Sequence, residues 1–405
     1  MQSSWRDSQV GRIKNRLKIA VLVRRFITTG GMERYVVEVT RRLARQHDVH
    51  VFCQERSWDG DEDITFHRIP KFFTRPSVLN LLVFSHYTGK YLDESFDIVH
   101  SHERVTHFNT LTVHCPCFRT FITDQEIRWR RLILWISVAM SPRKMAYLWL
   151  EKRQFSDNGK RIWIAVSEKV RKNVQENYNL PDKAFGLAYP GVDIELMKKG
   201  YDEENRENKR SGLGIDKDDL VILFVGTEFK RKGLDALLEG FSLIARNDTK
   251  LLIAGGGDQK GYLRAARRLG IENRVIFLGL VEDIENVYAI SDVYILPTLS
   301  EPAGMSPMEA MAAGLPTVLS SPEYAGSSEL IKNGEAMILK SPDRPREIAE
   351  ALSRLMDKDL REDLGSRGQR LARELTWERT TEDTLSVYKR ILQSRREGLN
   401  TREET

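Results

Sequence analysis

The sequence predicts an α/β protein built from two halves, each with a mainly parallel sheet covered by helices. The chain has 405 residues, which suits two domains better than one. Short apolar runs alternate with segments of helical periodicity, as in consecutive β-α-β units. This alternation stops at Tyr189-Pro-Gly-Val-Asp193 and at the charged stretch 198–210, which is expected to be a linker, and then restarts.

In the first half, strands are expected where apolar residues run together and helices where they recur at helical spacing. Tyr35, Val36, Val39 and Leu43 have the helical spacing and predict a helix over 32–45. Strands are expected at 18–23, 49–53, 96–100, 111–114 and 163–166. Residues 1–16 are predicted to be a polar extension, and 17–192 the first domain.

The second domain is predicted to cover residues 193–376, with the segment 377–395 returning to the first domain. The expected strands are 220–225, 250–254, 275–278, 293–296 and 316–319. The expected helices are 234–245, 259–269, 285–289, 306–313, 348–355, 361–375 and 377–392. Ligands of open α/β sheets bind at the carboxyl ends of the strands, so the cleft between the halves is the expected site.

Composition excludes several classes of protein. Hydrophobic residues make up 41% of the chain and charged residues 30%, which is typical of a soluble globular protein. The apolar run 132–140 is too short to span a membrane, and 19–23 is too short for a signal peptide. Cys53, Cys115 and Cys117 cannot all pair, so a reducing cytoplasm is expected.

The region 119–172 has a local excess of positive charge, with thirteen Lys or Arg against five Asp or Glu, so the rest of the chain is slightly acidic. Aromatic residues are interleaved with these cations, a pattern typical of helices that contact an anionic membrane surface. A helix pair packed on its own domain is the alternative, and no nucleic-acid recognition signature is present. The residues predicted to contact the membrane are Arg128, Trp129, Arg130, Arg131 and Trp135.

Glycine-containing turns follow the first strand of each half. Gly30 and Gly31 precede a helix, where glycines let the backbone approach a phosphate and the helix start offers free N–H groups. Gly226 opens a loop that ends in Arg231 and Lys232, adjacent cations that can neutralise a diphosphate. An ordinary turn and a solvated basic loop are the alternatives. Neither turn has the G-x-G-x-x-G spacing, which disfavours a nicotinamide dinucleotide site.

The strongest motif is the string EPAGMSPMEAMAAGLP at residues 301–316, directly after a predicted strand. Gly304 and the N–H groups of Met305 and Ser306 are expected to form a helix start that can hold an anion. Glu309 lies about one turn further on and can accept hydrogen bonds from a diol such as a ribose. Capping or salt-bridge roles for Glu301 and Glu309 are the alternative.

His114 ends a predicted strand and is expected to point into the same cleft, with a structural role as the alternative. His100, His102 and His107 lie nearby, but their spacing is not that of a metal site. No D-x-D-type cluster accompanies the motifs where a divalent metal would bridge a diphosphate. A reaction without metal or other cofactor is therefore expected.

The order of these motifs resembles the retaining glycosyltransferases of family 4. The resemblance covers roughly residues 17–392 and includes GGMERYVVEVTRRLA, YPGVD, VGTEFKRKGLDALLEGF, AGGGD, SDVYILP and the E-x7-E element Glu301/Glu309. It implies the GT-B fold, in which two Rossmann-like domains face each other across a cleft. The F-x-RKG-x-D phrase and the E-x-AG loop are similar to the bacterial lipopolysaccharide-core glucosyltransferases that use UDP-glucose.

The resemblance also implies roles for particular residues. His114 would lie near the reacting sugar, Arg231 and Lys232 would bind the diphosphate, and Glu301 would bind hydroxyls of the donor sugar. The implied donor-binding residues are Gly30, Gly31, Thr227, Leu280 (at the base), Gly304, Met305, Ser306 and Glu309 (at the ribose). Many relatives have arginine at the position of Thr227, so diphosphate binding is expected to depend more on the basic pair.

The resemblance implies transfer of a hexose, glucose in the first instance, from a UDP-sugar to a lipopolysaccharide-core or lipid-linked acceptor. The enzyme would act as a peripheral protein on the cytoplasmic face of the cell membrane. Another GT-B enzyme such as an epimerase, another donor such as GDP-mannose or UDP-N-acetylglucosamine, and a non-catalytic nucleotide-binding or scaffold protein are the alternatives. A nucleotide-sugar donor, an acceptor glycan and an anionic membrane are thus the expected partners.

Overall fold

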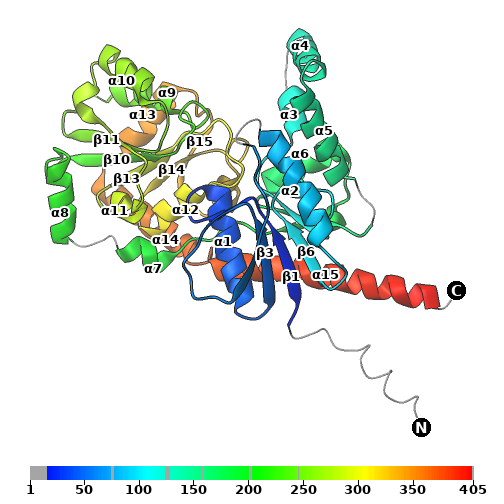
Figure 1. The fold of residues 1–405 in the computed structure, drawn as a ribbon. Coiled ribbons are helices and arrows are strands. Elements are labelled where there is room, and N and C mark those ends of the chain that lie inside the picture. The colour runs from blue at the N-terminus through cyan, green and yellow to red at the C-terminus, as the bar shows by residue number, and fades with distance from the viewer. Residues whose placement is uncertain are drawn as a thin grey trace.

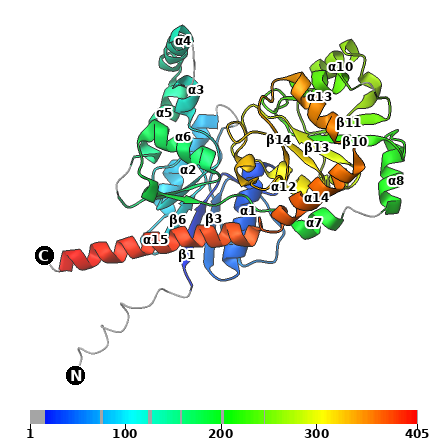
Figure 2. The same cartoon turned by 180° about the vertical axis from the view of Figure 1, so that it is seen from behind.

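The computed structural model describes residues 16–73, 77–123, 128–156, 159–199, 203–244 and 246–403. Figures 1 and 2 show two lobes, each with one large sheet covered by helices. All strand pairs of both large sheets are parallel. The predicted α/β class with two facing Rossmann-like lobes is therefore confirmed. Residues 1–15 of the predicted extension lie outside the described residues.

The sheet of the first lobe has seven strands in the order β5-β3-β1-β6-β7-β8-β9. Its strands are β1 (Lys18–Leu22), β3 (Asp48–Cys53), β5 (Ile64–Arg68), β6 (Ile98–Ser101), β7 (Thr110–Val113), β8 (Ile162–Ala165) and β9 (Phe185–Leu187). A separate pair is formed by β2 (Arg25–Ile27) and β4 (Glu55–Ser57). The sheet order steps outward from β1 in both directions, as in a doubly wound fold.

The helices of the first lobe cover this sheet, and α4 projects from the lobe at its far end (Figure 1). They are α1 (Gly31–Ala44), α2 (Ser77–Tyr91), α3 (Phe118–Thr123), α4 (Arg128–Ala139), α5 (Pro142–Gln154), α6 (Glu168–Tyr178) and the short η1 (Asp182–Ala184). The predicted helix over 32–45 is α1, and its buried face includes Tyr35, Val36, Val39 and Leu43. Helical spacing of apolar residues therefore identified the packed face correctly.

The sheet of the second lobe has six strands in the order β12-β11-β10-β13-β14-β15. They are β10 (Leu220–Val225), β11 (Thr249–Ala254), β12 (Val275–Gly279), β13 (Val293–Leu296), β14 (Thr317–Ser320) and β15 (Met337–Leu339). The central strand β10 is made of branched and aromatic apolar residues, and Val221 to Phe224 are fully buried. Such a continuous apolar run is typical of a strand covered on both faces.

The helices of the second lobe include two in the charged stretch that was expected to be a linker. They are α7 (Ile194–Lys199), α8 (Glu203–Gly212), α9 (Leu234–Ser242), α10 (Gln259–Arg268), η2 (Glu272–Arg274), α11 (Ile284–Ala289), α12 (Met305–Ala312), η3 (Gly326–Leu330), α13 (Pro345–Arg354) and α14 (Lys358–Ala372), and the C-terminal helix α15 (Trp377–Glu403) follows them.

The expectation of a linker over 198–210 is wrong for most of that stretch. Glu203 begins α8 and Arg210 lies in its last turn, an arrangement of charges that complements the helix dipole. The helix is anchored to its lobe, because Arg206 and Arg210 both form ion pairs with Asp292, at 2.6 and 3.5 Å. High charge alone therefore did not mark an unstructured connection.

The last helix, α15, crosses from the second lobe to the first, as Figure 2 shows. It packs against α1, β8 and β9. Trp377, Val387, Tyr388 and Ile391 are buried in the apolar core of the first lobe. The C-terminal segment thus completes the first lobe, although the strands before it belong to the second.

A buried hydrogen bond joins α15 to the sheet of the first lobe. His100 lies on β6, and its imidazole bonds to the Tyr388 hydroxyl on α15 and to the Thr112 hydroxyl on β7, both at 2.7 Å. Burial lowers the pKa of His100 to about 3, with a smaller contribution from the nearby His114. The ring is therefore neutral near pH 7, and it holds two elements together by hydrogen bonds without a charge.

The glycine turn after β10 is fixed by contact with the turn after β11. Gly255 has a φ of +145°, and a Cβ at this position would lie 1.7 Å from the carbonyl oxygen of Gly226. A larger residue would have to push the two turns apart and would also adopt a strained backbone conformation. Gly255 therefore holds the loop that leads to Arg231 and Lys232.

Replacing this glycine is expected to destabilise the second lobe. Gly255→Ala should lower the free energy of unfolding by about 2 kcal/mol or more, because it combines a clash with backbone strain. Gly261→Ala is the matched control, since Gly261 lies in α10 with open space around its Cα and alanine favours a helix. Urea unfolding of both variants measures the difference. Equal stability of the two would contradict the steric assignment.

The free energy of unfolding is expected to fall at acidic pH, because His100 takes up a proton more readily in the unfolded state. Since the folded pKa of about 3 lies below the unfolded value of 6.5, the stabilisation is complete above pH 6.5 and is lost as pH falls toward 3. For this group the loss is about 2 kcal/mol at pH 5 relative to pH 7.5. Urea midpoints at the two pH values should therefore differ less in His100→Asn than in wild type, whereas Tyr388→Phe keeps the titrating ring. Part of the pH dependence remains in His100→Asn, because burial also lowers the pKa of His107 to about 4 and that of His114 to about 3. An unchanged pH dependence in His100→Asn would refute this assignment.

Candidate active site

The two sheets place their motif-bearing loops at facing edges. In a parallel sheet all strands end at the same edge, so the loops after β1, β7 and β8 share one edge of the first lobe. The loops after β10 and β13 share the corresponding edge of the second lobe. Contacts between the lobes join these edges: the Ser167 hydroxyl donates a 2.5 Å hydrogen bond to the carbonyl of Pro302. The predicted cleft residues therefore lie at the junction of the lobes.

The second lobe contributes the start of α12. Gly304 immediately precedes this helix with a φ of +80°, a conformation that favours glycine. Met305 and Ser306 form the first helical positions, where backbone N–H groups lack partners within the helix. The Ser306 hydroxyl accepts a 2.8 Å hydrogen bond from Tyr294 on β13. The structure thus forms the helix start that the sequence predicted, with the geometry suited to an anion.

Glu309 is buried one turn into α12 and has partners on both carboxylate oxygens. Oε1 lies 2.6 Å from Nη1 of Arg34, which comes from α1 of the first lobe. Oε2 accepts a 2.9 Å hydrogen bond from the Tyr288 hydroxyl on α11. Burial lowers the pKa of Arg34, but Glu309 and other acidic groups more than offset this, and the net pKa is raised. Burial and the Glu309 charge also raise the pKa of Tyr288 well above 10, so its hydroxyl stays protonated.

The predicted diphosphate-binding pair contacts Glu301. Nζ of Lys232 lies 3.0 Å and Nη1 of Arg231 3.6 Å from the same carboxylate oxygen, Oε2. Arg231 also donates to the carbonyl of Ser300 and pairs with Glu228. The stem of Lys232 passes directly over Gly226, where a Cβ would lie 2.2 Å from its Cδ. The sequence-predicted cations and carboxylate are therefore brought together, each neutralising the other.

The first lobe contributes the glycine turn before α1. Gly30 has a φ of +99°, and Gly31 begins the helix. A Cβ on Gly31 would lie 3.9 Å from the sulfur of Met305 across the cleft. Ala303 is buried against the core of the first lobe as well. The two predicted anion-binding helix starts, those of α1 and α12, are thus neighbours.

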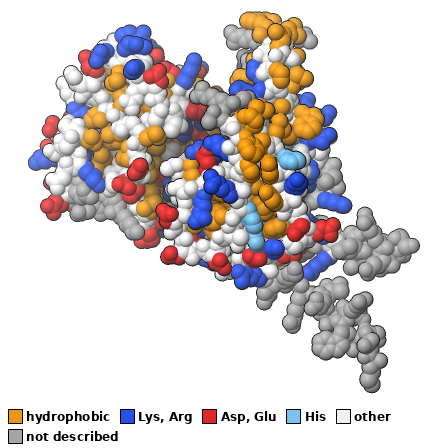
Figure 3. All heavy atoms as spheres, viewed as in Figure 1, with side chains coloured by type: hydrophobic (Ala, Val, Ile, Leu, Met, Phe, Trp, Pro, Cys, Tyr) orange, Lys and Arg blue, Asp and Glu red, His pale blue; other side chains and the backbone are white. Residues whose placement is uncertain are grey.

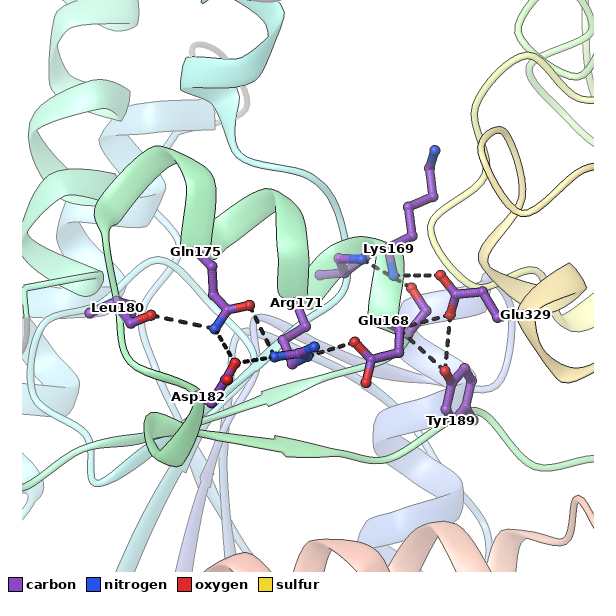
Figure 4. A network of polar contacts seen from close by, with 10 residues as sticks. Glu168, Lys169, Arg171, Gln175, Leu180, Asp182, Tyr189 and Glu329 are labelled. Atoms are coloured by element: carbon purple, nitrogen blue, oxygen red, sulfur yellow. Dashed lines mark hydrogen bonds and ion pairs between the residues drawn. The ribbon is translucent and has the colours of Figure 1, made fainter.

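A second polar contact joins the lobes at the start of α6 (Figure 4). Glu329 on η3 accepts hydrogen bonds from the backbone N–H groups of Glu168 and Lys169, at 2.8 and 2.6 Å, and from the Tyr189 hydroxyl at 2.9 Å. A carboxylate at a helix N-terminus satisfies free N–H groups and complements the helix dipole. Glu301 and Glu309 take no part in these hydrogen bonds.

Two predicted donor-binding residues are exposed. Thr227 follows Gly226 at the carboxyl edge of the sheet. Leu280 is 79% exposed after β12, where its side chain lies over Gly256: a Cβ there would meet Leu280 Cγ at 2.8 Å. An exposed apolar side chain on this edge has the position needed to contact a planar base. The roles of these two residues stay predictions.

The ring of His114, which follows β7, contacts the rings of His102 and of Tyr35 on α1. Its Nε2 is 2.9 Å from Nδ1 of the buried His102, and its ring meets Tyr35 edge-on at 5.0 Å between centroids. Burial lowers the pKa of His114 to about 3. The imidazole is therefore neutral near pH 7, suited to exchanging hydrogen bonds and unsuited to acting as a cation.

The predicted membrane-contact segment is α4 and its neighbours. Figure 3 shows hydrophobic side chains gathered over α4 at the tip of the first lobe. The exposed apolar residues there, which we term the α4 surface, are Phe121, Trp129, Leu132, Ile133, Trp135, Ile136, Met140, Met145 and Trp149. The side chains of Arg128, Arg130 and Arg131 lie outside the described part of the structure. A large exposed apolar patch usually marks an interaction site.

Sequence reasoning missed three residues that contact the predicted site. Arg34 lies in the first turn of α1, so the predicted helix start after Gly30 was a signal that could have identified it. Tyr288 and Tyr294 occur in apolar segments and are indistinguishable there from core residues. Their hydroxyl partners depend on how α12 packs against its sheet, which no local pattern encodes.

Two further findings concern metal-binding side chains and membrane-spanning helices. Within the described ranges, no group of three His, Cys, Asp or Glu side chains is arranged to hold a metal ion. Among the helices described, none combines the length and apolar character needed to cross a bilayer.

Two family models match the two lobes. Residues 29–196 match Glycosyltransferase Family 4, and residues 205–371 match Glycosyl transferases group 1. The chain is 29% identical over 307 residues to an uncharacterized glycosyltransferase of Methanocaldococcus jannaschii, covering 73% of this chain and 76% of that protein. It is 24% identical over 311 residues to lipopolysaccharide glucosyltransferase WaaG of Escherichia coli K12, covering 74% and 79%.

Solved structures share the fold. The crystal structure of WaaG, a glycosyltransferase involved in lipopolysaccharide biosynthesis, has a TM-score of 0.78 at 20% identity and covers 91% of this chain and 99% of that chain. HepE of Anabaena in complex with UDP and glucose has a TM-score of 0.66 at 16% identity, covering 92% and 100%. The sequence matches span both lobes, and the fold agrees over nearly the whole chain. This chain therefore belongs to the glycosyltransferases of family 4, with the GT-B fold.

Proposed function

We propose that the protein transfers a hexose, glucose in the first instance, from a UDP-sugar to a lipopolysaccharide-core or lipid-linked acceptor with retention of configuration. The observation that carries the proposal is the grouping of Arg231, Lys232, Glu301 and Glu309 around the start of α12. This set offers cations and N–H groups for a diphosphate and carboxylates for sugar and ribose hydroxyls. The similarity to WaaG and to the UDP- and glucose-bound HepE supports the same donor class.

The proposed chemistry follows from where charge develops. The bond between the anomeric carbon and the β-phosphate oxygen breaks, and the acceptor oxygen bonds to that carbon from the same face. The acceptor's proton passes to the β-phosphate oxygen, and negative charge builds up on the departing diphosphate. Arg231, Lys232 and the N–H groups of α12 would stabilise this charge in place, which is the role a metal plays in other transferases. The proposed reaction therefore needs no metal or other cofactor.

Glu301 and His114 would position the donor sugar. Glu301 would exchange its contact with Lys232 for sugar hydroxyls when the cation turns to the diphosphate. His114 would hydrogen-bond the sugar in its neutral form, since its pKa of about 3 excludes the imidazolium near pH 7. Gly30 and Gly31 would let donor and acceptor approach the backbone of the first lobe closely.

The donor is tested by a thermal-shift panel of UDP, GDP, ADP and NAD, each with and without magnesium. A ligand at 100 times its Kd stabilises a fold by about 2.7 kcal/mol, which shifts the midpoint measurably. Stabilisation by UDP alone, equal with and without magnesium, is the expected result. A response to GDP would favour a donor such as GDP-mannose. In a turnover assay, release of an altered UDP-sugar without transfer would favour an epimerase. UDP binding without any turnover would favour a scaffold protein.

The basic pair is expected to matter for turnover. Lys232→Met should lower kcat for UDP-hexose turnover by about 100-fold or more, because loss of one preorganised charge partner typically costs about 2.7–4 kcal/mol. Lys230→Met is the matched control, since Lys230 is an exposed cation of the same loop. Lys230→Met should keep the wild-type thermal midpoint. Lys232→Met should fold with a lower midpoint, because Glu301 loses a neutralising partner. Equal kcat values in the two variants would remove Lys232 from the proposed mechanism.

We further propose that the α4 surface binds the cytoplasmic face of the cell membrane and holds the first lobe near a lipid-linked acceptor. The α4 surface combines exposed tryptophan with leucine and isoleucine, and Arg128, Arg130 and Arg131 lie on the same helix. Aromatic and aliphatic groups enter the headgroup region while nearby cations attract anionic lipid. A reducing cytoplasm agrees with the free thiols of Cys53, Cys115 and Cys117.

Removing the apolar groups is expected to release the protein from anionic vesicles. Trp129→Gln combined with Leu132→Gln and Trp135→Gln should weaken vesicle binding by at least about tenfold, because each apolar side chain contributes on the order of 1.5–3 kcal/mol when buried. Sedimentation with phosphatidylglycerol vesicles measures this. Leu243→Gln with Leu263→Gln, exposed leucines of the second lobe, should bind normally. Undiminished binding of both the triple variant and a charge reversal of Arg128, Arg130 and Arg131 would disprove the membrane role.

A further inference from the structure

An ion pair between the lobes covers the carboxylate on which the proposed donor site depends. Nη1 of Arg34, on the first lobe, lies 2.6 Å from Oε1 of Glu309 on the second. The two side chains are 20% and 8% exposed, so the pair is largely shielded from water. The other oxygen of Glu309 is held by Tyr288. Both carboxylate oxygens of Glu309, the proposed ribose ligand, therefore already have protein partners.

The two partners of Glu309 differ in their freedom to leave. Tyr288 belongs to the same lobe, is fully buried in its core and cannot turn away without disrupting that core. Arg34 belongs to the opposite lobe, and its side chain is flexible and partly exposed. Its helix begins at Gly31, which is itself close to Met305 at the start of α12. A ligand that enters between these helix starts and reaches Glu309 must therefore meet Arg34.

We propose that Arg34 is a positioning residue that competes with the donor's ribose for Glu309, so that donor binding opens this contact between the lobes. The returning guanidinium would in turn displace the nucleoside diphosphate after transfer. This inference rests on the proposed function, because it takes Glu309 as the ribose ligand. It adds a charged side chain of the first lobe to the ribose end of the donor site, where the proposed ligand Glu309 belongs to the second lobe.

This competition should raise the apparent Kd for UDP by a measurable amount. A ligand that needs a partly occupied site binds with an apparent Kd raised by the reciprocal of the fraction that is free. A shielded pair with a charge-assisted hydrogen bond leaves Glu309 free only a minor part of the time. Removing the guanidinium should therefore tighten UDP binding by about tenfold, or 1.4 kcal/mol. Pyrophosphate has no ribose, so its affinity for the basic loop and α12 should stay the same.

The experiment compares UDP and pyrophosphate by isothermal titration calorimetry. Arg34→Gln should bind UDP about tenfold more tightly and pyrophosphate within about twofold of wild type. Arg34→Lys keeps the charge and should remain close to wild type for both ligands. Glu329→Ala is the matched control, since Glu329 also joins the lobes but does not contact Glu309. In turnover assays, Arg34→Gln should lower both KM and kcat, because the nucleotide leaves more slowly.

Several outcomes would overturn the inference. Weaker or unchanged UDP binding in a folded Arg34→Gln protein would mean that Arg34 does not compete. Equal tightening of pyrophosphate, or the same tightening in Glu329→Ala, would mean that the lobes are merely loosened. Glu309→Gln tests the proposed function separately: if UDP binding does not weaken in it, Glu309 is not the ribose ligand. If it weakens while Arg34→Gln fails to tighten UDP, the inference about Arg34 alone is wrong.

Discussion

Parallel strand pairing is the constraint on which the candidate site depends, because it sends every strand of a sheet to the same edge. In the first lobe that edge carries the glycine turn before α1, His114 and Ser167. In the second it carries the basic loop and the start of α12. The chain then returns through α15, which packs into the core of the first lobe and ties the lobes together. Residues from distant segments are thereby gathered at one junction.

The charged side chains at this junction neutralise one another. Lys232 contacts Glu301, Arg34 contacts Glu309, and Glu329 satisfies the N-terminus of α6. Each contact shields a charge that would be costly to bury alone. A nucleotide sugar offers the same kinds of group, a dianionic diphosphate and hydroxyl donors, so it can replace these internal partners. In the proposed function, donor binding would therefore open contacts that join the two lobes.

The two ends of the first lobe differ in the polarity and exposure of their side chains. At the junction the side chains are polar and largely buried, whereas the α4 surface is apolar and exposed. Trp129 and Leu132 are 59% and 61% exposed, whereas Trp163 is fully buried in the core of the same lobe. An acceptor held at a membrane would thus approach the lobe from the side of α4, with the donor bound in the other lobe. The proposed roles of the two lobes would therefore follow from surface chemistry as well as from topology.

The sequence alone determined the inner strands of both sheets, the helix α1, the glycine turns, and the Glu301–Glu309 spacing that places two carboxylates around one helix start. These are local features, because periodicity and turn chemistry act within a few residues of each other. The sequence did not predict the edge strands β5, β9 and β15. The charged residues of α8 were misleading, since a helix pinned by Asp292 has the same composition as a linker. Tertiary structure decided the partners: Arg34 and Glu309 are 275 residues apart in sequence. Their contact depends on how two separately folded sheets face each other, which no local pattern contains.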